Sequence, residues 1–316
     1  MNNTLIITES HYGTTKKAGY YLSLILGFSK SIEIDDAPES IDKYENIICM
    51  FCFYGYRTAE KLKAYLNIIK GQLTDKKVIL IGVGIDKTNL NYYTGEILKI
   101  IDNKADIVDF IPGDLIIEKL SHEDKTLLKG FFKKNNIEFT DMKKFNIESV
   151  INISDKIKNM FYESSKILAS EKLSSEINKF IGLHNTCALA TGSGSDIRNT
   201  PIEYIYYKNN FYFITEGGQK FAGILKNPNV SIAIYDNYKA MDRLAGLQVT
   251  GKSEIIVADC SEYYDIMKLK NLSKESLMTF QVSLNIVKVH PVKFEFMNSD
   301  FSKGGYDIKQ ILNLPE

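Results

Sequence analysis

The sequence predicts two domains: a doubly wound α/β domain with a parallel sheet, then an antiparallel β barrel with helices. The chain has 316 residues, more than one typical hydrophobic core supports. Strand-like and helix-like patterns alternate in the first half, whereas short β-rich runs separated by turn signals fill the second. We expect domains at residues 1–145 and 172–316, joined by a helical connector at 146–171.

Near-continuous apolar strands alternate with helices along residues 1–145, a pattern typical of a parallel sheet covered on both faces. The predicted strands are Leu5–Thr8, Ser31–Ile34, Asn46–Phe53, Lys77–Gly82 and Ala105–Ile111, and the predicted helices are Thr14–Leu26, Thr58–Ile69 and Tyr93–Ile101. Ligands of such sheets bind beyond the carboxyl ends of the strands. Three segments fall there, namely Ser10–Thr15, Tyr54–Thr58 and Gly82–Tyr93.

The loop from Ser10 to Thr15 joins the first strand to its helix and has the composition of a phosphate site. Backbone N–H groups and the positive dipole end at the start of a helix attract anions. Gly13 lets the backbone approach closely, and the threonine and serine hydroxyls can donate hydrogen bonds. No lysine of the Walker type follows the glycine, which favours a phosphomonoester over a nucleoside triphosphate. An ordinary strand-to-helix turn with polar capping is the alternative.

Aromatic residues accompany the other two segments at the same sheet edge. Tyr54 and Tyr56 flank Gly55, precede Arg57 and follow a buried strand, so we expect them to stack on or edge a flat ring. Tyr92 and Tyr93 follow the fourth strand and could cover the other face of that ring. Surface tyrosines framing turns are the alternative interpretation at both places.

Composition argues against several classes of protein. Lys plus Arg and Asp plus Glu both number 39, so there is no basic excess for binding nucleic acid. We expect no signal peptide, and no run approaches the roughly 20 apolar residues of a membrane span. The four cysteines are no disulfide framework, which favours a reducing, cytoplasmic setting. Cys49 and Cys52 have CxxC spacing, but we expect core cysteines on opposite faces of one strand, and no metal site.

Residues 172–316 have the pattern of a small antiparallel barrel. The predicted strands are Thr186–Thr191, Pro201–Tyr207, Asn210–Thr215, Val230–Tyr235, Gly246–Ile256 and Ile286–Phe296, and the predicted helices are Lys220–Lys226 and Ser261–Lys270. Lys220 begins a helix after Thr215 and two glycines, so its ammonium group and nearby N–H groups could hold a phosphate. A solvated surface lysine is the alternative.

The motif S-x-Y-G-T-T, here Ser10–Thr15, resembles the FMN-phosphate loop of flavodoxins. It is most similar to the flavodoxin-like branch that includes protoporphyrinogen dehydrogenases, and Pro112–Leu128 resembles the stretch after the last strand of that branch. The resemblance covers most of residues 3–135. The FMN site that it implies, together with the tyrosine segments, consists of Ser10, His11, Tyr12, Gly13, Thr14, Thr15, Tyr54, Gly55, Tyr56, Arg57 and Tyr92.

The order of parts in residues 172–316 resembles the FMN-binding split barrel of pyridoxamine 5'-phosphate oxidase-like proteins. The matching motifs are Cys187–Thr191, Phe211–Thr215 and the block from Lys220 to Tyr235. The resemblance implies a homodimer with two flavins at its interface, where Gln248 approaches the flavin from the partner subunit. The residues assigned to FMN are Ile202, Glu203, Tyr204, Gln219, Lys220 and Gln248. Where many family members carry arginine this chain has Lys220, and Arg198 and Arg243 are the nearby arginines.

Together the two resemblances imply an FMN-dependent oxidoreductase with up to two FMN molecules per chain. Electrons would pass between the two flavins and on to a substrate, with a nicotinamide nucleotide or a redox partner as candidate donor. The sequence does not identify the substrate or any catalytic residue. Two alternatives stay open: a split barrel that binds haem, a tetrapyrrole or flavin without turnover, and a pure electron carrier.

Overall fold

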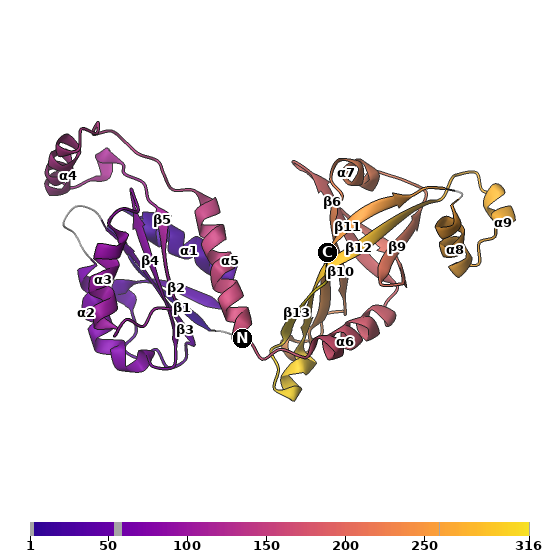
Figure 1. Ribbon diagram of the computed structural model, residues 1–316, viewed down its shortest axis with the longest axis horizontal. Coiled ribbons are helices and arrows are strands. Elements are labelled where there is room, and N and C mark those ends of the chain that lie inside the picture. The colour runs from indigo at the N-terminus through magenta and orange to yellow at the C-terminus, as the bar shows by residue number, and fades with distance from the viewer. Residues whose placement is uncertain (1–2, 54–58, 259, 316) are drawn as a thin grey trace. The chain divides into compact units, whose positions relative to one another are not determined.

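The computed structural model describes residues 3–53, 59–258 and 260–315 (Figure 1). The chain divides into two compact units, Met1–Ser164 and Ser165–Glu316. Among the described residues, every helix is too short or too polar to traverse a lipid bilayer.

The first unit is built on a five-stranded parallel sheet with the strand order β2-β1-β3-β4-β5. The strands are β1 (Thr4–Glu9), β2 (Ser29–Glu33), β3 (Asn46–Cys52), β4 (Lys77–Gly84) and β5 (Ile107–Pro112), and the helices are α1 (Thr14–Leu26), α2 (Glu60–Ile69), α3 (Leu90–Ile100), α4 (His122–Lys134) and α5 (Ile147–Glu163). The order reverses between β1 and β3, which places a crevice at the carboxyl ends of these strands. The predicted parallel sheet is confirmed.

Helices cover both faces of this sheet, which explains why its central strands are apolar throughout (Figure 1). On one face, Leu66 of α2 and Ile97 of α3 pack in a cluster with Cys49 of β3. On the other face, Leu22 of α1 packs with Ile48 of β3 and with apolar side chains of α5. Burial raises the pKa of Cys49 to about 12, so this thiol is a core group, as predicted.

The boundary between the units differs from the expected one. Residues 147–163 form α5, whose apolar stripe of Val150, Ile153 and Ile157 is buried against α1 and the sheet. Burying that stripe makes α5 a layer of the first unit instead of part of a connector. The next helix, α6 (Ser170–Gly182), buries Leu173 and Ile177 in the core of the second unit.

A small subdomain follows β5 in the first unit. Residues Leu115 and Met142 pair as an isolated antiparallel bridge, and α4 lies between them in the chain. Ser121 caps α4 by accepting a hydrogen bond of 3.1 Å from the Asp124 N–H group, as its spacing predicts. The segment has its own apolar cluster, made by Leu115, Leu120, Leu128 and Phe132. We refer to residues 113–142 as the α4 segment.

The second unit is a curled antiparallel sheet that forms a half-barrel, with the order β7-β6-β10-β11-β12-β9-β8 and with β13 added to β12 (Figure 1). The strands are β6 (Thr186–Ser193), β7 (Asp196–Glu203), β8 (Ile205–Tyr207), β9 (Asn210–Thr215), β10 (Asn229–Tyr235), β11 (Ala245–Ile256), β12 (Asn285–Asn298) and β13 (Lys309–Asn313), and the remaining helices are α7 (Lys220–Lys226), α8 (Ser261–Leu269) and α9 (Lys274–Met278). The predicted antiparallel split barrel is confirmed. Strand β13 and helix α9 were not predicted, and the predicted strand Pro201–Tyr207 is divided between β7 and β8.

The two faces of the half-barrel differ in side-chain size. Leu189 of β6, Ile232 of β10 and Val249 of β11 point into the barrel core and are fully buried. Because side chains alternate along a strand, Ala188 and Ala233 lie on the outer face, where the strand register pairs them. The register continues from Ala233 to Gln248 and from Gln248 to Glu295, so small and polar side chains line this outer row.

A cluster of charged side chains around Lys288 of β12 attaches helix α8 to the barrel. The Lys288 Nζ atom lies 2.9 Å from Glu262 Oε1 and 3.2 Å from Glu254 Oε1, and the Tyr212 hydroxyl donates to Glu262 at 2.8 Å. The hydrogen bond from Lys288 lowers the pKa of Glu262 below its ordinary value of 4.5. A lowered folded-state pKa stabilises the fold above the unfolded value, and the contribution is lost as the pH falls through the folded value.

We therefore expect Glu262→Gln to be less stable than the wild type at neutral pH, with the difference closing as the pH falls below about 4.5. Urea unfolding of both proteins over a pH series measures this. Stability curves that stay parallel down to acid pH would show that Glu262 makes no net ionic contribution.

Candidate functional sites

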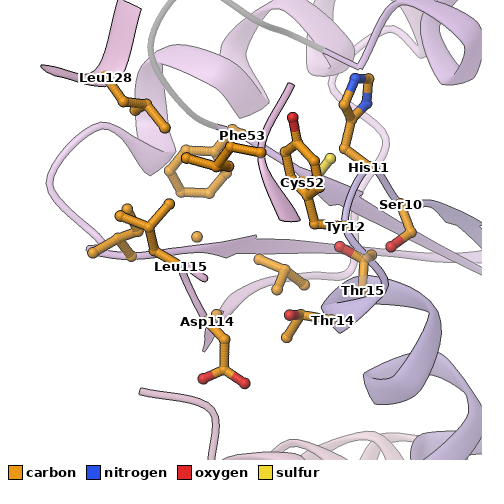
Figure 2. Close-up of a pocket in the computed structure, with 15 residues that line it drawn as sticks. Ser10, His11, Tyr12, Thr14, Thr15, Cys52, Phe53, Asp114, Leu115 and Leu128 are labelled. Carbon is orange, nitrogen blue, oxygen red and sulfur yellow. The ribbon is translucent and has the colours of Figure 1, made fainter. Parts of the chain in front are cut away.

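A pocket opens at the carboxyl ends of β1, β3, β4 and β5 in the first unit (Figure 2). The residues that line it are Ser10, His11, Tyr12, Thr14, Thr15, Cys52, Phe53, Val83, Gly84, Ile85, Gly113, Asp114, Leu115, Leu120 and Leu128. Five of these residues belong to the predicted loop Ser10–Thr15. The structure therefore brings the phosphate-type loop to the sheet edge where ligands of this architecture bind.

The loop is shaped for an anion at the start of α1. Gly13 is the N-cap residue with φ of 93°, a left-handed conformation that favours glycine, and no side chain caps the helix. The Ser10 hydroxyl accepts a hydrogen bond of 3.1 Å from the Gly13 N–H group, which tightens the turn. Thr15 is buried and Thr14 is partly exposed, and both line the pocket beside Ser10 (Figure 2). Hydroxyl groups and the first-turn backbone thus converge on one end of the pocket.

The opposite end of the pocket is lined by apolar side chains. Phe53, at the end of β3, stacks on Tyr93 with ring centroids 4.8 Å apart, and Leu115 and Leu128 lie opposite the hydroxyl end (Figure 2). A Cβ atom on Gly84 would lie 3.0 Å from the Phe53 ring, so a larger residue there would require this ring to shift. A polar end joined to an apolar slot suits a flat ring that carries a phosphate.

The other predicted residues of the first unit have different outcomes. Tyr54, Gly55, Tyr56 and Arg57 lie outside the described residues. Tyr92 is 67% exposed, packs edge-on against Tyr93 and is not among the pocket-lining residues.

Sequence reasoning missed the residues that the tertiary fold adds to the pocket. Cys52 faces away from Cys49, as expected, but it lines the pocket instead of the core. Phe53 directly follows β3, and this position at the carboxyl end of a strand could have identified it as a residue of the pocket. Leu120 and Leu128 come from the α4 segment, for which the sequence carried no such signal.

In the second unit, Lys220 is buried, being only 7% exposed at the start of α7. Its ammonium group donates to the Gly217 carbonyl and lies 5.6 Å from the centroid of the Phe221 ring. Burial lowers the pKa of Lys220; the charge of Glu216 opposes this effect, and the charge of Arg198 adds to it. A buried ammonium group next to a second cation is arranged to gain from an anionic ligand.

Strand β7 carries further polar groups close to helix α7. Arg198, Thr200 and Ile202 alternate along this strand and share one face. The Thr200 hydroxyl is buried, and within the described residues it has no hydrogen-bond partner. Asn227, at the end of α7, donates to the Gly192 carbonyl at 3.1 Å and so fastens this helix to the β6–β7 hairpin. A buried hydroxyl without a partner, on the strand that also carries Arg198, fits a polar ligand beside β7.

Two of the predicted residues near β7, Tyr204 and Glu203, have side-chain partners within the chain. The Tyr204 hydroxyl donates to the Ile181 and His184 carbonyls at 2.7 and 3.0 Å, and burial raises the pKa of its phenol. Glu203 accepts a hydrogen bond of 2.6 Å from Lys270. Gln219 is exposed at the N-cap of α7. Tyr204 is therefore a core side chain, and its backbone N–H group donates to the Asn185 carbonyl at 2.9 Å.

Gln248 lies apart from Lys220 within one chain. It lines a separate open pocket of about 960 Å³ with Arg243 and Tyr235, and Lys220 is not among the lining residues of that pocket. In the strand register, β10 and β6 stand between Gln248 and Pro201 of β7. The residues predicted to share one site therefore form two separate groups on the half-barrel.

The two units match family models of the flavin-related class of proteins. The family model for the flavodoxin domain matches residues 5–142, and the model for pyridoxamine 5'-phosphate oxidase matches residues 173–293. The chain is thus a fusion of a flavodoxin domain with a pyridoxamine 5'-phosphate oxidase-like domain, as its motifs predicted. Domains of both kinds typically bind flavin.

Similar solved structures align with parts of the chain. A protein from Listeria innocua described as a pyridoxamine 5'-phosphate oxidase is 17% identical, covering 40% of this chain and 98% of its own, with a TM-score of 0.33. An FAD-binding protein from Mesorhizobium loti is 17% identical over 38% of this chain and 89% of its own, with a TM-score of 0.33. HutZ, the haem-storage protein of Vibrio cholerae, is 14% identical over 37% of this chain and 88% of its own, with a TM-score of 0.32. A search of curated proteins found no match.

Proposed function

We propose that this protein is an FMN-dependent oxidoreductase with one flavin site on each unit. The observation that supports this proposal most is the pocket of the first unit, where three hydroxyl residues and an uncapped helix start lie at one end of an apolar slot. Bound FMN would supply the redox chemistry, and the residues of the chain would bind and orient it.

In the first unit, Ser10, Thr14 and Thr15 would bind the phosphate of FMN together with the first backbone N–H groups of α1. Phe53, Leu115 and Leu128 would contact the ring and exclude water from it. The chain lacks the G-x-G-x-x-G motif of dinucleotide sites after β1, which favours a mononucleotide over a dinucleotide.

In the second unit, Lys220 and Arg198 would bind the phosphate, since the buried ammonium group would gain an anionic partner. Ile202, Glu203 and the backbone of Tyr204 would border the ring, and Gln219 would lie at the phosphate end. The buried hydroxyl of Thr200 would gain a hydrogen-bond partner from the ligand or from ordered water.

A homodimer would complete the second site. Gln248 lies apart from Lys220 within one chain, so Gln248 would act on the flavin site of a partner subunit. The outer row of Ala188 and Ala233 lets a flat ring or a second sheet approach closely. Tyr235, which is 62% exposed on the same face of β10, would be covered in such a dimer.

The purified protein is expected to be yellow and to release FMN, and no FAD, on denaturation. Chromatography of the released flavin, with the flavin-to-chain ratio, measures this. A colourless protein that takes up no added FMN would refute the proposed function. Anaerobic mixing with NADH or NADPH then separates an enzyme reduced by a nicotinamide nucleotide from a carrier that needs a protein donor.

A further inference from the structure

A hydrogen-bond network ties the loop Ser10–Thr15 to a segment that lies far along the chain. The Tyr12 hydroxyl donates to the Asp124 carboxylate, 112 residues away. The Ser121 N–H group donates in turn to the Tyr12 oxygen at 3.2 Å. The Tyr12 side chain therefore reaches from the loop to the first turn of α4.

Asp124 is a buried carboxylate, with an exposed fraction of only 1%. A buried carboxylate is unfavourable unless hydrogen bonds and dipoles compensate for lost water. The start of α4 supplies a favourable helix dipole, and the Tyr12 hydroxyl supplies a donor. Loss of the Tyr12 hydroxyl would leave this carboxylate less well satisfied, so the link between loop and helix is costly to break.

The α4 segment forms one wall of the pocket. It contributes Gly113, Asp114, Leu115, Leu120 and Leu128 to the lining. Leu128 follows Asp124 by one helical turn, so both lie on the same face of α4. Tyr12 packs against the apolar cluster of this segment while its neighbours in the loop line the polar end of the pocket. Tyr12 thus contacts both the phosphate end of the pocket and its apolar wall.

We propose that Asp124 is a positioning residue of the first flavin site: through Tyr12 it holds the α4 segment against the phosphate loop. This inference rests on the proposed function, because it takes FMN as the ligand of the pocket. Asp124 is not among the lining residues, and it acts on the pocket through Tyr12, which lines it. Its effect is to couple the two ends, so that the loop binds the phosphate more tightly when the wall is in place for the ring.

The test is a double-mutant cycle in the full chain with FMN as the ligand. Tyr12→Phe and Asp124→Ala are each expected to weaken FMN binding at the first site about tenfold, and the double variant no further, because both remove the same link. Asp124→Asn keeps an acceptor oxygen and should recover most of the affinity. The visible spectrum of the FMN still bound is expected to shift in both single variants, since the wall no longer fixes the ring environment.

Tyr65→Phe is the matched control. The Tyr65 hydroxyl donates to the Pro38 carbonyl at 2.7 Å in the same unit, and Tyr65 does not line the pocket. This control should lose thermal stability but keep the FMN affinity and spectrum of the wild type. Binding at the second unit is measured with a Thr14→Val/Thr15→Val variant and subtracted.

The outcomes separate this inference from the proposed function. A wild-type chain that binds no FMN would overturn both. A wild type that binds FMN, with Tyr12→Phe and Asp124→Ala matching Tyr65→Phe in affinity and spectrum, would overturn only the role of Asp124. Additive losses in the double variant would also overturn it. If Asp124→Ala does not fold, the comparison of Tyr12→Phe with Tyr65→Phe decides the question.

Discussion

Replacing Thr14 and Thr15 together with valine is expected to empty the flavin site of the first unit and to leave the second filled. Each hydroxyl would donate a hydrogen bond to a charged phosphate, worth about 1.5–3 kcal/mol. Losing both would cost about 3–6 kcal/mol, or roughly a hundred- to ten-thousandfold in affinity. Valine is close to threonine in shape, so the buried position of Thr15 is not left as a cavity. The flavin-to-chain ratio of the purified variant measures the effect.

Thr74→Val is the control for this double replacement. Thr74 is an exposed threonine that precedes β4, at the opposite edge of the sheet from the pocket. Its replacement should leave the flavin content unchanged. A double variant that keeps all of its flavin, or one that loses flavin from both units, would contradict the assignment of the loop, because the two sites share no residue.

Lys220→Ala is expected to weaken FMN binding at the second unit about ten- to hundredfold. The lost contact is a charge-assisted hydrogen bond to phosphate, worth roughly 1.5–3 kcal/mol. Lys220→Arg should be milder because the charge remains, although the forked geometry of guanidinium differs. Titration of FMN into the full chain that carries Thr14→Val and Thr15→Val measures the second site alone.

Lys226→Ala is the matched control for Lys220. Lys226 ends the same short helix and is exposed, so its removal should not change the FMN affinity. Equal affinities of the wild type and both alanine variants would leave Lys220 without a role in phosphate binding. The contact would then move to Arg198, whose charge acts on Lys220, or to Arg243, which lines the pocket of Gln248.

Local patterns were sufficient to predict most elements of the two sheets. Helix α1 begins and ends at the predicted residues, Thr14 and Leu26, and α7 also has its predicted bounds. Helical periodicity and strand-like apolar runs depend on neighbours in the chain, so they can be recognised without the fold. The loop Ser10–Thr15 was recognisable for the same reason, since its glycine and hydroxyl residues are contiguous.

Packing partners were not predictable in the same way. The polar residues of 147–163 suggested a connector, whereas the burial of Val150 and Ile157 makes α5 a layer of the first unit. An amphipathic pattern shows that a helix has an apolar face but does not name the surface that covers it. The assignment of α5 therefore depended on contacts between residues distant in sequence.

The sites show the same division between local and long-range information. Local sequence identified the phosphate loop and Lys220 as candidates because each is a contiguous motif. The apolar wall with Leu128, the link from Tyr12 to Asp124, the closeness of Arg198 to Lys220 and the separation of Gln248 from Lys220 required the folded chain. Each of these depends on distances between segments that strand order and helix packing set, and residue spacing alone carries no such distances.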